Sequence, residues 1–184
     1  AVIRTAIQDK LTGVLSLTTN PFKIDPIGYL SVLRGLGYAA VYTKPGSKVR
    51  RGTDAARHMV FDAVTLTAWV RFRTAEDREI ETGIDSQINK IDAPLNKVML
   101  DTLLLRHQYD VMRNLKPKSK LSLLFEDREA VHAKFGEVGL NVLRTSQGKI
   151  TLEQIAAIHG LSTLEVAEIL VWASEKGLVE MMKN

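Results

Sequence analysis

The stretch GKITLEQIAAIHGLSTLEVAEILVWASEKGLVE, residues 148–180, decides the fold of the C-terminal third of this chain. It predicts two helices joined by a short turn. Thr151 is a side-chain acceptor suited to cap the first helix, and Gly160 is suited to end it. Ser162, followed three residues later by Glu165, forms the capping box that begins the second helix. A glycine ends this second helix, and a short apolar strand follows.

Apolar residues recur at helical spacing in both predicted helices, as Val166, Ile169 and Leu170 do in the second. With a further helix before them and the strand after them, residues 128–181 resemble the winged-helix/helix-turn-helix superfamily. The resemblance implies a winged-helix C-terminal domain, and it is far more specific for fold than for DNA binding. A second, weaker resemblance covers residues 25–52. No family resemblance extends over the whole chain.

The second of these helices carries carboxylates at positions where a DNA-recognition helix needs cations. In similar winged helices, the positions that reach bases include those of Glu165 and Glu168, and carboxylates repel the phosphate backbone. Leu164, Val171 and Trp172 lie partly off the buried stripe, which predicts an exposed apolar face of the kind found at protein interfaces. We therefore predict a protein-interaction surface at Leu164, Glu168, Val171 and Trp172. The alternative is that Trp172 packs against the preceding helix.

Basic residues gather in the N-terminal part of the chain, where residues 1–60 carry nine Lys/Arg against three Asp/Glu. Many of them flank the turn-forming pair Pro45-Gly46 of a predicted hairpin. Arg71 and Arg73 share one face of a predicted strand over residues 63–73, and they extend the patch if that strand is adjacent. The predicted nucleic-acid contacts, which would lie along the phosphates of double-stranded DNA, are Lys44, Lys48, Arg50, Arg51, Arg57, Arg71 and Arg73. The alternative is a solvated charged loop.

The remaining N-terminal elements are predicted from apolar spacing and from helix-starting residues. Residues 3–17 are weakly helical in pattern. Asp25-Pro26 predicts the start of a helix that runs to Leu36. Residues 38–52 predict the hairpin. A helix is also predicted from Asp92-Ala-Pro94 to Leu115.

The domain organisation follows from the polar, proline-containing run that begins at Lys116. We predict an N-terminal α+β domain with a basic hairpin over residues 1–115, a linker over 116–121 and a winged-helix domain over 122–184, which includes a helix at about 126–144. The predicted fold class is mostly α, with small β-hairpin and wing elements (α+β).

Composition and motifs exclude several classes of function. The chain of 184 residues has an ordinary globular composition, with 45% hydrophobic and 25% charged residues. It has no cysteine, so disulfides and thiolate metal sites are excluded. It contains no nucleotide-binding or nucleophile motif, and its four histidines are scattered. We therefore predict no catalytic residue, no metal site, no cofactor and no membrane association, and we expect a cytoplasmic protein.

These observations favour a DNA-binding protein, either a transcriptional regulator or a replication or partition accessory factor. Its winged-helix domain would serve partly for protein interaction, with a homodimer or another protein as the partner. The alternative is a protein-protein adaptor subunit built from winged-helix domains that does not bind nucleic acid directly. An enzyme is the third and least favoured reading.

Overall fold

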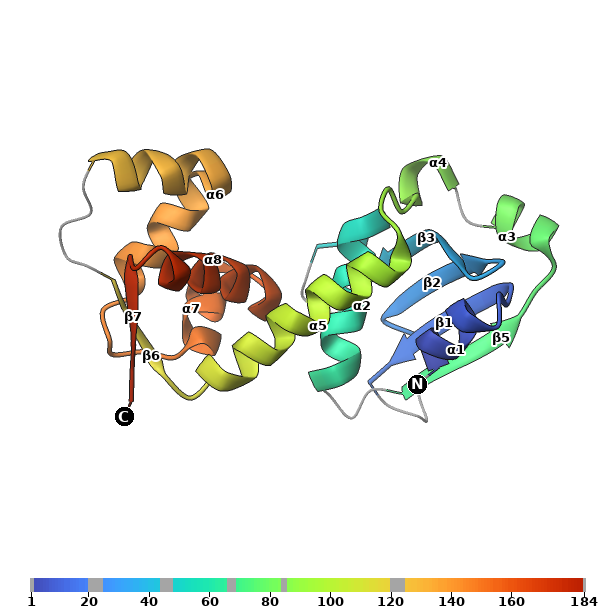
Figure 1. The fold of residues 1–184 in the computed structure, drawn as a ribbon, viewed down its shortest axis with the longest axis horizontal. Helices are drawn as coiled ribbons and strands as arrows, with labels where there is room; N and C mark the ends of the chain where they lie inside the picture. The colour runs from blue at the N-terminus through green and yellow to red at the C-terminus, as the bar shows by residue number, and fades with distance from the viewer. Residues whose placement is uncertain are drawn as a thin grey trace. The chain divides into compact units, whose positions relative to one another are not determined.

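The computed structural model describes residues 2–19, 25–43, 48–65, 69–83, 86–119 and 125–183. The chain forms two compact units, residues 1–103 and 104–184 (Figure 1). Both helices and antiparallel strands are present, which confirms a fold that mixes α and β elements. The sheet is larger than the small hairpin and wing elements that the sequence predicts.

The N-terminal unit is built on a five-stranded antiparallel sheet in the order β4-β3-β2-β1-β5. One helix precedes the sheet, and others are inserted before and after its last strand. In chain order, the elements are α1 (Val2–Gln8), β1 (Gly13–Thr18), β2 (Gly28–Leu33), β3 (Leu36–Tyr42), β4 (Arg50–Arg51), α2 (Gly52–Thr65), β5 (Trp69–Thr74), α3 (Asp77–Gly83), α4 (Ser86–Asn89) and the first half of α5 (Leu95–Met112). The boundary between the two units falls within α5, after Leu103.

The core of this unit lies between one face of the sheet and helices α2 and α5. Leu15 of β1 and Leu30 of β2 are fully buried and face the same side. Met59 of α2, with Leu95 and Val98 at the start of α5, packs on them. Because side chains alternate along a strand, the residues between the buried leucines project from the opposite face. The sheet therefore has one face in the core and a second face available for other contacts.

The predicted helix from Asp25-Pro26 to Leu36 is wrong, because these residues form β2 and the start of β3. Of the apolar residues that suggested a helix, Ile27 and Leu30 are buried in the core, whereas Leu36 is 72% exposed. The reason for the hairpin is the pair Arg34-Gly35, which has positive φ angles of 50° and 78° and joins Leu33 to Leu36. Positive φ at both central residues is the geometry of the tight hairpin turns that match strand twist.

The other N-terminal predictions are partly confirmed. Of residues 3–17, only the beginning is helical, as α1, and the rest contains β1. The hairpin predicted over 38–52 is present, since β3 and β4 pair antiparallel. Of the strand predicted over 63–73, the part from Trp69 onward is confirmed as β5, whereas residues 63–65 belong to α2. The helix predicted from Asp92-Ala-Pro94 is confirmed as α5.

The C-terminal unit contains β6 (Lys116–Ser119), α6 (Phe125–Thr145), α7 (Leu152–His159), α8 (Thr163–Glu175) and β7 (Val179–Met182). The positions of the helices agree with the sequence predictions, except that a non-helical backbone at Gly136 divides α6 at a kink. Ser162 and Glu165 form the predicted capping box, with Glu165 N donating to Ser162 Oγ at 3.2 Å. Gly160 ends α7 in the left-handed conformation. The axes of α7 and α8 differ by 118°.

Part of the predicted linker is a strand. Lys116–Ser119 form β6, which pairs antiparallel with β7, so that Lys116 lies opposite Met182. Lys118 also bridges to Gln147, just after α6. Pro117 is tolerated there because the strand is short and belongs to a two-stranded sheet. The polar composition of this run predicts a linker, whereas its pairing with distant residues makes it part of the second unit.

Within the described ranges, no single helix is long and apolar enough to cross a membrane, and α7 and α8 meet that test only as a bent pair.

The Arg34-Gly35 turn gives a test of the fold. A Cβ on Gly35 would lie 2.7 Å from the Ile7 carbonyl oxygen, and the backbone there has positive φ. We expect Gly35→Ala to destabilise the protein by about 1–3 kcal/mol, measured as a lower midpoint in urea unfolding. Gly83→Ala is the matched control, because a Cβ there meets nothing within 4 Å. Equal stability of the two variants would contradict this account of the turn.

Candidate functional site

The predicted basic patch is divided by the order of the strands. Arg50 and Arg51 form β4, at one edge of the sheet, whereas Arg71 and Arg73 lie on β5, at the other edge. Four strand spacings, roughly 19 Å, separate these edges. The expectation that Arg71 and Arg73 extend the hairpin patch is therefore wrong. Their predicted position on one face of a shared strand is correct.

At the β4 edge, the predicted cations differ in exposure. Lys48 and Arg51 are exposed, and Arg57 is half-buried on α2. Lys44 lies outside the described residues. Arg50, in contrast, is only 8% exposed, so it is a poor candidate for a phosphate contact. Among the described residues of the hairpin, the exposed cations are therefore Lys48 and Arg51.

Arg50 belongs to a partly buried polar network that joins β4 to α2, in which the Asp54 side chain is 50% exposed. Its Nη1 donates to Asp54 Oδ2 at 3.1 Å, and His58 Nδ1 lies 3.2 Å from Asp54 Oδ1. Burial alone would raise the pKa of the Asp54 carboxyl, but hydrogen bonds with His58 and Arg50 outweigh it and lower the pKa to about 2. The network thus stabilises a charged carboxylate at the start of α2.

A second buried pair lies close to this network. Tyr42 of β3 donates a short hydrogen bond to Asp62 of α2, and its ring centroid is 5.6 Å from that of His58. Burial, aided by the Asp62 hydrogen bond, raises the pKa of Tyr42 well above its usual range. These groups are engaged with one another across the contact between β3 and α2. We therefore infer that these groups hold α2 against the sheet.

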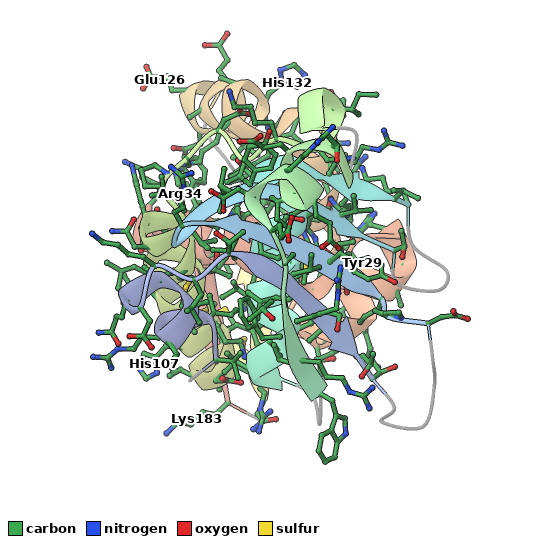
Figure 2. All side chains as sticks on the ribbon, turned by 90° about the vertical axis from the view of Figure 1, so that its right-hand side faces the viewer. Tyr29, Arg34, His107, Glu126, His132 and Lys183 are labelled. Carbon is green, nitrogen blue, oxygen red and sulfur yellow. The ribbon has the colours of Figure 1, made fainter. Side chains whose placement is uncertain are left out.

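The second face of the sheet forms a groove against α3. The groove has a volume of about 360 Å³. Tyr29 of β2 projects on this face (Figure 2). Arg73 of β5 lines the rim and pairs with Glu79 of α3 at 2.5 Å. The sequence indicated the face that Arg73 shares with Arg71, but the contribution of α3 to a groove was not predictable from it.

Two of the four residues predicted to form an interaction surface on α8 are buried, and the other two are partly exposed. Leu164 is 1% exposed and Val171 is 9% exposed, so the prediction that they form an exposed apolar face is wrong. Trp172 is partly buried, and its ring stacks edge-on against Phe135 of α6 at a centroid distance of 5.5 Å. This is the alternative packing that the sequence left open. Glu168 is partly exposed.

Helix α5 contributes residues that lie beside α8 within the C-terminal unit. Gln108 Nε2 donates to Glu175 Oε1 at 3.4 Å, and Met112 and Val171 line one hollow of about 180 Å³. Tyr109 also donates to Glu153 of α7 at 2.5 Å. The end of α5 therefore lies over the face of α8 that carries Val171. This covering explains why apolar residues at the edge of the core stripe are not exposed.

Helix α5 also carries exposed apolar residues that the sequence predictions did not name. Within the C-terminal unit, Leu104 and Val111 are 56% and 63% exposed, and Val111 lines the hollow between α5 and α8. Their spacing of seven residues places them on one side of the helix, two turns apart. Leu105 and Tyr109, on the other side, are buried. Apolar residues on both sides of one helix were the available signal, since a helix that is apolar all round needs partners on both faces.

No group of three His, Cys, Asp or Glu side chains that could hold a metal ion occurs among the described residues. Comparisons with protein-family models, characterised proteins and solved structures found no match to this chain.

The Asp54 network predicts a dependence of stability on pH. The folded-state pKa lies below the ordinary value of 3.8, so the ionised carboxylate stabilises the fold above that pH. This stabilisation is lost as the pH falls from 3.8 towards about 2. We expect Asp54→Asn to be less stable than the wild type at pH 7, with the difference shrinking as the pH approaches 2, measured by urea unfolding. A difference that does not vary with pH would contradict the assignment.

Proposed function

We propose that this chain is a protein-protein adaptor whose C-terminal unit has a winged-helix fold. Support for the fold comes from α6, α7 and α8, from the 118° bend between α7 and α8, and from the strand that follows. Support for the function comes from the surfaces that this unit and α5 offer. The adaptor role is the second of the two functions that the sequence suggested, and it requires no contact between α8 and DNA.

The character of α8 is the observation that carries this proposal. A recognition helix needs exposed donors and cations on the side that enters the major groove. In α8, Leu164 and Ala167 are buried, and Glu165 is used as the capping residue. Its sequence, TLEVAEILVWASE, contains no Lys or Arg. Insertion of this helix into DNA would therefore bring carboxylates to phosphates without a compensating cation.

The two exposed apolar residues of α5 in the C-terminal unit, Leu104 and Val111, are here called the α5 stripe, and this is the surface we assign to the partner. Each residue is more than half exposed. Such a surface matches the way an amphipathic helix is recognised, with apolar contacts spaced by whole turns. We assign it an α-helical partner segment with an apolar face, in another protein or in a second copy of this chain. Burial of these side chains would supply the main favourable term for association.

Substitution on the α5 stripe tests the adaptor proposal. We expect Leu104→Glu to abolish self-association or partner capture, because it places a charge in an apolar contact. Folding should change little, because Leu104 is exposed. The measurements are light scattering after size-exclusion chromatography, capture of cross-linked partners and thermal unfolding.

The matched control for Leu104→Glu is Ile158→Glu, at a residue of α7 that is 61% exposed. It makes the same chemical change away from the α5 stripe. The proposal fails if both variants associate like the wild type, or if the wild type is a monomer that captures no partner.

A DNA-binding regulator or replication or partition accessory factor is the second candidate function. The observation in its favour is the β3–β4 hairpin, which carries exposed Lys48 and Arg51 at the edge of the sheet. Cations at such an edge can lie along a phosphate backbone without reading bases. On this hypothesis, the N-terminal unit would contact nucleic acid and the C-terminal unit would contact protein.

A salt titration tests this second candidate. We expect Lys48→Ala/Arg51→Ala to weaken binding to random-sequence duplex DNA and to reduce the slope of log K against log salt by about 1.8, if each cation neutralises one phosphate. Lys176→Ala, at an exposed lysine following α8, is the control. Arg50 is avoided because it is buried and paired with Asp54. A slope that is unchanged by the double substitution would exclude the hairpin as the contact.

A further inference from the structure

The groove on the second face of the N-terminal sheet is the feature that carries an inference beyond the proposed adaptor function. Its sheet wall consists of residues that alternate with the core positions of β1, β2 and β3, and α3 forms the facing wall. Its volume of about 360 Å³ lies within the range of small-molecule sites. The lining residues are Val14, Tyr29, Ser31, Val41, Arg73, Glu79, Ile80 and Gly83.

Ser31 places an unpartnered hydroxyl at the sheet wall of this groove. The residue is 1% exposed, and its Oγ has no hydrogen-bond partner among the described residues. Its neighbours across the sheet are Val14 and Ala39, neither of which has a polar side chain. A buried hydroxyl without a partner destabilises the fold, because its hydration is lost and not replaced. A ligand atom in the groove would supply the missing partner.

The rest of the lining favours an apolar ligand without net charge. Tyr29, Val14, Val41 and Ile80 provide aromatic and aliphatic walls. The charges at the rim are those of Arg73 and Glu79, which neutralise each other in a 2.5 Å ion pair. Because the pair is exposed, solvent screens its charges, and the rim presents no net charge to attract an ionic ligand. A neutral ligand leaves the pair intact.

We propose that this groove binds a small neutral molecule with an aromatic or aliphatic body and one hydrogen-bonding oxygen. The oxygen is a carbonyl or a hydroxyl that pairs with Ser31 Oγ. The body packs between Tyr29 and Val41 on the sheet and Ile80 on α3. Gly83 borders the open part of the groove, where an added Cβ would meet nothing within 4 Å.

Three matched probes test the proposal on the full chain. They are 2-acetylnaphthalene, which is neutral, 2-naphthoate, which is an anion, and 2-naphthylmethylammonium, which is a cation. Binding is followed by chemical-shift changes at the groove residues. We expect saturable binding of the ketone and weaker binding of both ions. Absence of saturable ketone binding, or equal affinity for all three probes, would overturn the proposal.

Substitutions then locate the site. Ser31→Ala should weaken ketone binding roughly three- to tenfold while leaving thermal stability unchanged or raised, because the hydroxyl has no partner in the protein. Ser16→Ala, on the same sheet face but outside the groove lining, should bind like the wild type. Gly83→Phe should block the groove without disturbing the core. If Ser31→Ala and Gly83→Phe both bound the ketone as tightly as the wild type does, the assignment of the groove as the binding site would be wrong.

Discussion

The register of β2 is the constraint on which the N-terminal unit depends. Leu30 and Val32 face the core, while Tyr29 and Ser31 face the groove. A slip of one residue would exchange these sets, placing a serine hydroxyl and a phenol in the core and two aliphatic side chains on the open face. The turn at Arg34-Gly35 sets the pairing of β2 with β3 next to the turn, and a β-bulge between Val32 and Ser31 then shifts the register of β3 by one residue. Core packing and groove chemistry are therefore two results of one alignment.

The sequence predicts the parts of the fold that depend on local chemistry. The capping box of Ser162 and Glu165 and the glycine stop at Gly160 each act within a few residues, and both are present. The helix predicted over Asp25–Leu36 is wrong because the apolar spacing of so short a segment fits a helix and a strand equally well. Only the conformation of the Arg34-Gly35 pair decides between them, and a non-glycine residue with positive φ is not apparent from composition.

The candidate site was predicted less well, because charge and exposure depend on strand order and on packing between distant elements. Arg50 and Arg51 are adjacent in sequence, yet one is buried against Asp54 and the other is exposed. Arg71 and Arg73 were correctly placed on one strand face, but nothing local reveals that β5 pairs with β1 rather than with β4. On α8, the end of α5 covers Val171, which an analysis of α8 alone would leave exposed.

The pairing of β6 with β7 has a kinetic consequence. Lys116 lies opposite Met182, 66 positions later in the chain, whereas α7 and α8 are joined by a short turn. Contacts between near neighbours form quickly, and contacts that close long loops form slowly because the loss of chain entropy precedes any gain. Helices α7 and α8 can therefore pack together before β6 pairs with β7. During synthesis, the apolar side of the helices emerges before the strand that closes the unit, and this interval is when the unit is most open to aggregation or to capture by a chaperone.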